Sequence, residues 1–528
     1  MTRVYVVMLA CLGLGLSSPL TPQEHQHGAP GAAALGTVDF STSCAPTVRL
    51  DFNRAVALLH SFEYDTAREE FAKIADRDPN CAMAHWGSAM TYFHGAWGEV
   101  DQDNGAKQAA LAREISEKTP ATTAREKQYI AAVSALYSEP AATVLDRSNA
   151  FSAGMAKVHE TNPQDDEGSI FYALSLFVSS GRDKTYANQA KCGEILGPLF
   201  KKLPNHPGIA HYLIHCYDNP ALAEEGLSAA REYAKIAPDS AHATHMPSHI
   251  FVRLGLWPDT VQSNLSSMQV AAREPGTCHG RGSQLHAMHF LQFAYLQLGQ
   301  QAKAKEVAQQ ALALSTVDGC GSGRFVAASY ALQAHDWKMA LNLRPDSTTD
   351  DLPASEVTWT AIGVAAARTG DVKTARRAAQ ELATLRDIAM KKIAAGPNGP
   401  SEAARLQVEA WLTQALGDST KALELMRHAD EIGGYPSWTQ PTPAEHLGDL
   451  LMEQHQPAAA LAAYQKALEN TPNLFNALYG AALAADAAGD HARARNYYGK
   501  LIEVAGTGDR AEIGTARNKM NRQSQEGN

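Results

Sequence analysis

Regularly spaced histidines are the side chains of this sequence best suited to chemistry. His211 and His215 lie four residues apart in HYLIHCYD, and the same interval separates His245 from His249 in HATHMPSHI. Residues four apart share one face of a helix, so each pair can clamp a metal ion. His245 follows His211 by 34 residues, and His249 follows His215 by the same number. The two pairs are therefore expected at equivalent positions on neighbouring helices.

Neighbouring helices pack with their axes about 8–10 Å apart, so imidazoles from both helices can meet between them. Imidazole is a common ligand of zinc, copper and iron. The predicted metal ligands are His211, His215, His245 and His249. The residues predicted to complete the pocket are Asp218, His242, His286 and His289. Pro247 lies within the second motif and predicts a kink there.

Two other interpretations of the histidines remain open. The cluster could instead form a polar groove for a substrate, without a metal. It could also be structural packing that was copied when a repeat was duplicated. The HxxxH spacing is a weak motif without the glutamate of HExxH. If either interpretation holds, the protein needs no cofactor.

The elements that must position these histidines are helical hairpins. Residues 441–474 carry Gly448, Ala460, Tyr464, Ala467 and Pro472 at the spacing of a tetratricopeptide repeat. In such a repeat the small residues let two helices approach, the aromatic ring fills the gap, and proline ends the second helix. The pattern predicts an all-α fold, a tetratricopeptide-like solenoid of stacked antiparallel hairpins.

Loops rich in turn-forming residues divide the solenoid. We predict an N-terminal array over residues 49–345, which contains the histidines, and a C-terminal array over 354–505. A polar tail is expected over 506–528. The concave surface of such a stack is the default binding site.

The start of the chain predicts export. Arg3 precedes a short apolar stretch, and small residues follow it, so residues 1–18 have the features of a signal peptide and 19–48 those of a flexible leader. A lipoprotein anchored at Cys11 is an alternative, although Leu9 fits a lipobox poorly. No later segment is long and apolar enough to span a membrane. We therefore expect a periplasmic or secreted protein.

Cysteine positions agree with an oxidising compartment. Six cysteines follow the signal peptide, and six allow 15 connectivities. The helical-hairpin interpretation selects pairs that lie at the same end of a hairpin or face each other across a turn. The pairs predicted in this way are Cys44–Cys81, Cys192–Cys216 and Cys278–Cys320. Buried free thiols are the alternative.

Composition excludes some classes of function. The formal net charge is −10, whereas nucleic-acid-binding proteins carry basic patches that replace counterions. The sequence also contains no phosphate-binding glycine loop and no dinucleotide fingerprint.

Several stretches between residues 42 and 299 resemble exported bacterial tetratricopeptide-repeat proteins of unassigned function. The matching stretches are TSCAP (42–46), FNRAVALLHSFEYDTAREEF (52–71), DPNCAMAHWGSAM (78–90), HYLIHCYDNP (211–220), HATHMPSHIFVRLGLW (242–257) and LHAMHFLQFAYLQLG (285–299). The resemblance implies a helical-repeat fold and export, but no reaction or ligand. The family pattern has an acidic residue where His289 stands, which makes His289 the weakest member of the predicted pocket.

The leading prediction is an exported binding protein. Its concave face would capture a peptide segment or a small ligand, and its histidine-lined pocket would suit a transition metal. The first alternative is a metal-dependent enzyme, a hydrolase or an oxidoreductase, that uses the same histidines. The second alternative is a pure protein–protein interaction scaffold.

Overall fold

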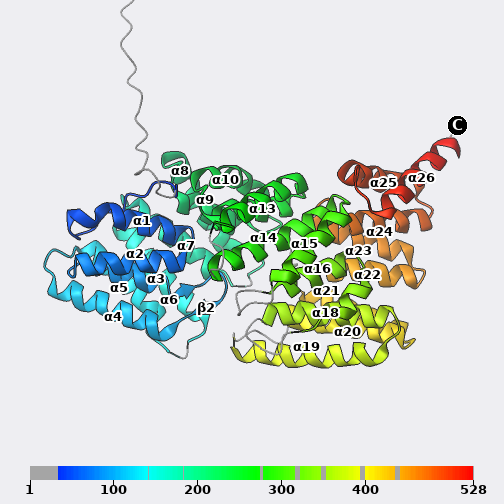
Figure 1. Cartoon of the computed structure of the whole chain (residues 1–528), viewed down its shortest axis with the longest axis horizontal. Coiled ribbons are helices and arrows are strands. Elements are labelled where there is room, and N and C mark those ends of the chain that lie inside the picture. Colours follow the sequence, from blue (N-terminus) through cyan, green and yellow to red (C-terminus); the bar gives the residue numbers. More distant parts are fainter. Residues whose placement is uncertain are drawn as a thin grey trace, which may run out of the picture.

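The computed structural model describes residues 34–140, 142–181, 183–273, 278–314, 322–345, 352–392, 399–433 and 441–526. This part of the chain is helical apart from a short antiparallel hairpin, β1 (Phe93–His94) with β2 (Glu99–Val100). The prediction of an all-α solenoid is thereby confirmed (Figure 1). The predicted signal peptide and the first half of the leader lie outside the described residues.

The N-terminal elements fold as successive antiparallel helices. Their bounds are η1 (Pro46–Val48), α1 (Arg49–His60), α2 (Tyr64–Arg77), α3 (Ala82–Met90), α4 (Gln102–Lys118), α5 (Ala124–Leu136), α6 (Val144–Thr161), α7 (Asp166–Val178), α8 (Ala187–Lys202), α9 (Pro207–Tyr217), α10 (Ala223–Ile236), α11 (Ala241–His245), α12 (Pro247–Arg253) and α13 (Trp257–Ala271). Local sequence explains many of their starts. Thr123 and Glu126 form a capping box at α5, and Pro207 opens α9 at a position that needs no backbone N–H.

The same pattern continues to the C-terminus. The remaining helices are α14 (Cys278–Gln297), α15 (Gln301–Leu314), α16 (Gly323–Gln333), α17 (Trp337–Asn342), α18 (Leu352–Arg368), α19 (Val372–Lys392), α20 (Pro400–Ala415), α21 (Ser419–Ile432), α22 (Pro443–Glu453), α23 (Pro457–Asn470), α24 (Phe475–Ala487), α25 (His491–Ala505) and α26 (Ala511–Glu526). None of the helices in the described ranges combines the length and the apolar character needed to cross a bilayer.

Within many hairpins, the turn between the helices uses one residue with positive φ. Glycine usually holds this position because it lacks a Cβ. The glycines at such turns are Gly255, Gly299, Gly370, Gly417 and Gly489. Between α1 and α2 the residue is Phe62, with φ of 58°. A bulky side chain is rare in this conformation, and here the turn is closed by hydrogen bonds from the N–H groups of Phe62 and Glu63 to the carbonyl oxygens of Leu59 and Leu58.

Buried hydrophobic side chains form two large groups in the described part of the chain, drawn from residues 35–251 and 252–516. Helices near the C-terminus also contact residues from the middle of the sequence. The indole N–H of Trp257 donates to the carbonyl oxygen of Asn473 at 3.0 Å, and the N–H of Phe475 donates to Gln297 at 2.8 Å. In Figure 1, α14 and α15 accordingly lie between the N-terminal helices and α24.

Two of the predicted disulfides are present. Cys44 is bonded to Cys81 and Cys192 to Cys216, with Cα–Cα distances of 4.7 and 6.3 Å. The second bond ties α8 to α9, the helix that carries His211. The third predicted pair, Cys278 with Cys320, involves side chains outside the described residues.

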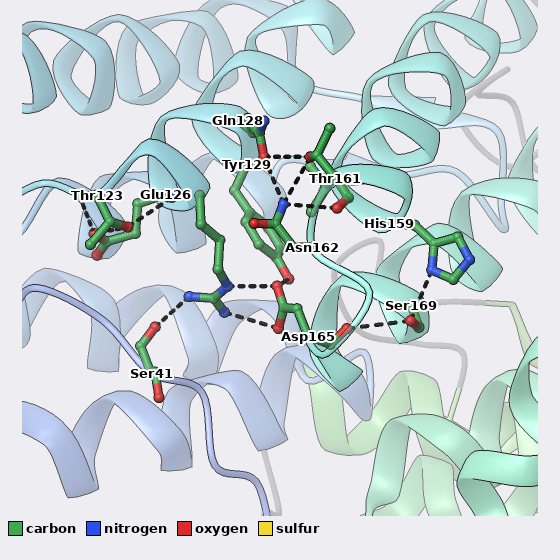
Figure 2. A network of polar contacts seen from close by, with 12 residues as sticks. Ser41, Thr123, Glu126, Gln128, Tyr129, His159, Thr161, Asn162, Asp165 and Ser169 are labelled. Atoms are coloured by element: carbon green, nitrogen blue, oxygen red, sulfur yellow. Dashed lines mark hydrogen bonds and ion pairs between the residues drawn. The ribbon is translucent and has the colours of Figure 1, made fainter.

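Residues at the two ends of the described chain pack into the fold. The sequence suggests a flexible leader over 19–48, but Phe40 is buried and its ring lies 5.2 Å from that of Tyr129. The carbonyl oxygen of Ser41 accepts a hydrogen bond from Arg125, which also pairs with Asp165 (Figure 2). Tyr129 donates to the same carboxylate at 2.8 Å. Residues 34–48 are therefore attached to α5 and to the loop between α6 and α7.

The C-terminal segment, for which the sequence suggests a polar tail, contains α26. Ile513 and Ala516 of this helix are buried. The N–H of Asp509 donates to the carbonyl oxygen of Gly299 at 2.8 Å, which joins the segment to the turn after α14. The described residues of 506–528 thus pack against the middle of the solenoid.

Candidate metal centre

The predicted histidines occupy the first helices of consecutive hairpins. His211 and His215 lie on α9, His242 and His245 on α11, His249 on α12, and His286 and His289 on α14. The helix is interrupted at Met246, between α11 and α12, where Pro247 predicts a kink. The histidines thus project from neighbouring hairpins into a shared region.

Three of them form the first histidine group, which consists of His211, His215 and His242. The Nε2 atom of His211 lies 3.0 Å from Nε2 of His242 and 3.0 Å from Nε2 of His215. Two nitrogens bound to one tetrahedral metal ion at about 2.0 Å would lie about 3.3 Å apart. Both distances are therefore close to that between two ligands of a single ion, and one ligand nitrogen from each of the three rings lies within 4.8 Å of the others.

The backbone of α1 fixes the tautomer of His211. Its Nδ1 lies 2.6 Å from the carbonyl oxygen of His60, and a carbonyl oxygen can only accept a hydrogen bond. The proton of the neutral ring is therefore on Nδ1, and Nε2 presents its lone pair to His215 and His242. Burial lowers the pKa of His211 well below 6.5, and the neighbouring His215 lowers it further. The ring is thus neutral at pH 7, as a metal ligand must be.

A buried carboxylate lies behind this contact. Glu167 accepts from Nε2 of His60 and from Nε2 of His206, both at 3.0 Å. Burial alone would raise the pKa of Glu167, but these two imidazoles hold it below its usual range. Nδ1 of His60 in turn lies 2.9 Å from the hydroxyl of Tyr212. This network holds α1, α7 and α9 in register beside the first histidine group.

The second histidine group consists of His245, His249 and His286. One ligand nitrogen from each lies within 4.8 Å of the others. Nε2 of His245 and Nε2 of His249 are 3.1 Å apart, and the rings of His245 and His286 have centroids 4.3 Å apart. His245 and His249 are buried, whereas His286 is exposed. This group is therefore reachable from solvent on the α14 side.

Asp218 lies outside this group and orients one member of it, His249. Its Oδ2 accepts from Nδ1 of His249 and its Oδ1 from Nε of Arg253, each at 2.9 Å. Burial opposes the charge, but Arg253 and His249 hold the pKa of Asp218 below its usual range. The carboxylate is therefore ionised and faces the side of His249 that points away from His245. This geometry is that of an outer partner of a metal ligand.

Aromatic rings surround both groups. The ring of Phe62 lies 4.4 Å from that of His211, and the ring of Phe177 stacks on His215 at 4.7 Å. Phe290 lies 4.7 Å from His245 and 4.9 Å from His249. The rings make the surroundings of the nitrogens largely apolar.

The structure divides the four predicted ligands between two groups and completes each with a pocket residue, His242 or His286. His289 is not part of either group: its Nε2 lies 3.1 Å from the hydroxyl of Ser329. Sequence reasoning did not identify Phe62, Glu167 or Asn264, whose Oδ1 lies 2.7 Å from Nδ1 of His245. The contacts of Phe62 and Glu167 join distant segments, so no local spacing reveals them. The sequence does indicate Arg253, because it follows His249 at the four-residue spacing that places two side chains on one face of a helix.

Comparison with known families identifies one repeat of the chain. The family model for tetratricopeptide repeats matches residues 476–505, which span α24 and α25. This chain contains a tetratricopeptide repeat. The matched segment includes Ala494 and Tyr498, which repeat Ala460 and Tyr464 of the predicted tetratricopeptide repeat after 34 residues. No curated protein matches the chain.

Several solved structures are similar to the chain at low TM-scores. The human IFIT1 dimer with PPP-AAAA has 13% identity and a TM-score of 0.39, over 85% of this chain and 89% of that one. The Cut9–Hcn1 hetero-tetramer of the APC/C has 10% identity and a TM-score of 0.33, over 89% of each chain. Yeast Tom70 has 12% identity and a TM-score of 0.32, over 90% of this chain and 96% of that one. Similarity at this level carries no functional information.

Proposed function

We propose that this protein is an exported helical-repeat protein that binds a transition metal through His211, His215 and His242. The observation that supports it is the convergence of three imidazole nitrogens, with two Nε2–Nε2 distances of 3.0 Å. A nitrogen lone pair accepts one hydrogen bond, so His211 cannot satisfy both neighbours as an acceptor. A metal ion can accept the lone pairs of all three rings.

Elemental analysis tests this proposal. Untagged protein would be purified without chelator and analysed by inductively coupled plasma mass spectrometry, before and after reconstitution with zinc, copper or iron. Near-stoichiometric metal is expected in the wild type, and His242→Ala should contain less. His289→Ala is the matched control because this buried imidazole belongs to neither group, and it should keep the wild-type content. A wild-type protein that takes up none of the three metals would refute the proposal.

Export is the second part of the proposal. Its support is the signal-like composition of residues 1–18 together with two disulfides, which persist in oxidising compartments. Protein expressed with its native N-terminus should appear in the periplasm or medium, with an intact mass that corresponds to loss of about the first 18 residues. Uncleaved protein retained in the cytoplasm, with Cys44 and Cys192 open to alkylation, would contradict export.

The solenoid fold itself suggests binding of a peptide or protein, because helical repeats commonly use their concave surface in this way. A peptide segment in that groove is therefore the second candidate function, supported by the tetratricopeptide repeat at 476–505. The two functions separate experimentally. A partner captured through the concave groove alone should bind His242→Ala as tightly as the wild type, whereas metal-dependent binding or catalysis should weaken with the metal content.

A further inference from the structure

The second histidine group has its own reason to bind an ion. The side-chain amide of Asn264 donates to the carbonyl oxygen of Thr260 at 2.8 Å, so its Oδ1 faces Nδ1 of His245 at 2.7 Å and must accept. Nδ1 of His249 donates to Asp218. Nδ1 of each ring is thus engaged in a hydrogen bond, while Nε2 of His245 and Nε2 of His249 lie only 3.1 Å apart. With one ring nitrogen of His286 they make a set of three possible ligand atoms within 4.8 Å of one another, which is compact enough to hold one cation.

The two groups are adjacent and share a helix. α11 contributes His242 to the first group and His245 to the second, and these residues are only three apart. Across the boundary, the ring of His215 lies 6.4 Å from that of His249. Ions held by the two groups would therefore be close neighbours, each with three imidazole ligands.

The ligand chemistry favours copper. In the described part of the chain both groups consist of histidines alone, and the carboxylate of Asp218 faces Nδ1 of His249 on the far side of that ring. Two divalent ions would bring four positive charges among neutral imidazoles and phenylalanine rings, which is costly in an apolar environment. Two Cu(I) ions bring half that charge, and copper is well suited to imidazole.

We infer that the two histidine groups form a paired copper centre that binds dioxygen. This inference rests on the proposed function and extends it, since it assigns a second ion and a ligand to the same pocket. Each Cu(I) ion gives one electron to dioxygen, so that one O₂ becomes one peroxide and both ions become Cu(II). The reaction needs no proton and no further reductant, and release of O₂ reverses it. The exposed edge at His286 gives dioxygen a route of entry.

The test uses the full-length oxidised protein, loaded with Cu(I) without oxygen and then exposed to air. Copper per chain would be measured by mass spectrometry, oxygen uptake with an electrode, and Cu(II) by electron paramagnetic resonance. We expect two coppers and one O₂ per chain, with a resonance intensity far below that of two isolated Cu(II) ions because adjacent spins couple. His286→Ala should lose one copper and the oxygen uptake, so its remaining copper should stay Cu(I) in air, and an added oxidant such as ferricyanide should then give the resonance of one isolated Cu(II) ion. His289→Ala should behave as the wild type.

The outcomes separate the two proposals. No copper in the wild type would refute metal binding altogether. One copper per chain, unchanged in His286→Ala, would leave metal binding intact and overturn the paired centre. Two coppers with the full intensity of isolated ions would also overturn it. Because His286 is exposed, its substitution should leave folding unaffected; His286→Gln provides a second variant, and circular dichroism checks both.

Discussion

Nδ1 of His211 lies 2.6 Å from the backbone carbonyl oxygen of His60, although 151 residues separate the two in the sequence. The contact makes the first hairpin part of the proposed metal site. It directs the lone pair of His211 towards the other histidines, and Phe62, two residues after His60, covers the same ring. The pocket therefore depends on the closure of α1 onto α9 as much as on the histidine helices themselves.

Substitution Glu167→Gln should weaken this closure. The glutamine side chain offers one acceptor where the carboxylate accepts from both His60 and His206, so one buried imidazole N–H loses its partner. We expect a loss of about 1–3 kcal/mol in the free energy of unfolding, measured by urea denaturation of metal-free protein. Asp166→Asn is the control: it alters an ion pair with the exposed Lys202, which should contribute at most about 1 kcal/mol. Equal effects of the two substitutions would contradict the role assigned to Glu167.

Asp218→Asn should weaken metal binding by the second histidine group. The amide can present its NH₂ group to Nδ1 of His249 and so favour the wrong tautomer. Loss of an outer partner of a ligand typically costs 10–100-fold in metal affinity, that is, about 1.4–2.7 kcal/mol. Affinity would be measured by competition with a chelator, under conditions where circular dichroism shows the variant to be folded. A purely structural role predicts lower stability with unchanged affinity. The exposed Asp259→Asn should change neither quantity.

Much of this architecture is predictable because it is local. The period of 34 residues, the small residues at helix contacts and Pro247 all act within one hairpin or between neighbours, and they predict the solenoid and the helices that carry the histidines. Pairing within the centre is different. The partner of His211 is His242 and not His245, which is the residue equivalent to His211 in the repeat. The reason is that the relative rotation of α9 and α11 is set by tertiary packing. Contacts across 100 residues or more, such as Glu167 with His60, leave no periodic signal.

Glu445 predicts a pH dependence for the C-terminal array. The residue is buried at the start of α22, where its Oε2 accepts from the N–H of Thr442 at 2.8 Å. Burial, with Asp449 nearby, raises its pKa to about 7. In the unfolded chain a glutamate has a pKa of about 4.3. The folded protein thus binds the proton more tightly, so Glu445 lowers stability as pH rises from about 4.3 to about 7.

Glu445→Gln should therefore be as stable as the wild type at pH 4 and more stable at pH 8. The neutral amide keeps an acceptor for Thr442 without a buried charge, and we expect a gain of about 1–3 kcal/mol at pH 8. Urea denaturation of both proteins at the two pH values measures the difference. The exposed Glu469→Gln on α23 should show no such change with pH. A glutamine variant that is less stable than the wild type at pH 8 would show that the ionised carboxylate is needed.

Within the matched tetratricopeptide repeat, two glycines should respond to alanine in opposite ways. A Cβ on Gly480 would lie 2.4 Å from the ring of Tyr464, whose hydroxyl donates to Asp449 at 2.6 Å and fixes the ring between α22 and α24. A Cβ on Gly499 would meet no atom within 4 Å. Alanine favours a helix over glycine by about 1 kcal/mol, so Gly499→Ala should stabilise the protein. Gly480→Ala should instead destabilise it by about 1–3 kcal/mol through overpacking. Thermal denaturation of both variants measures the difference, and equal shifts would show that the ring moves freely and that Tyr464 does not hold the hairpins together.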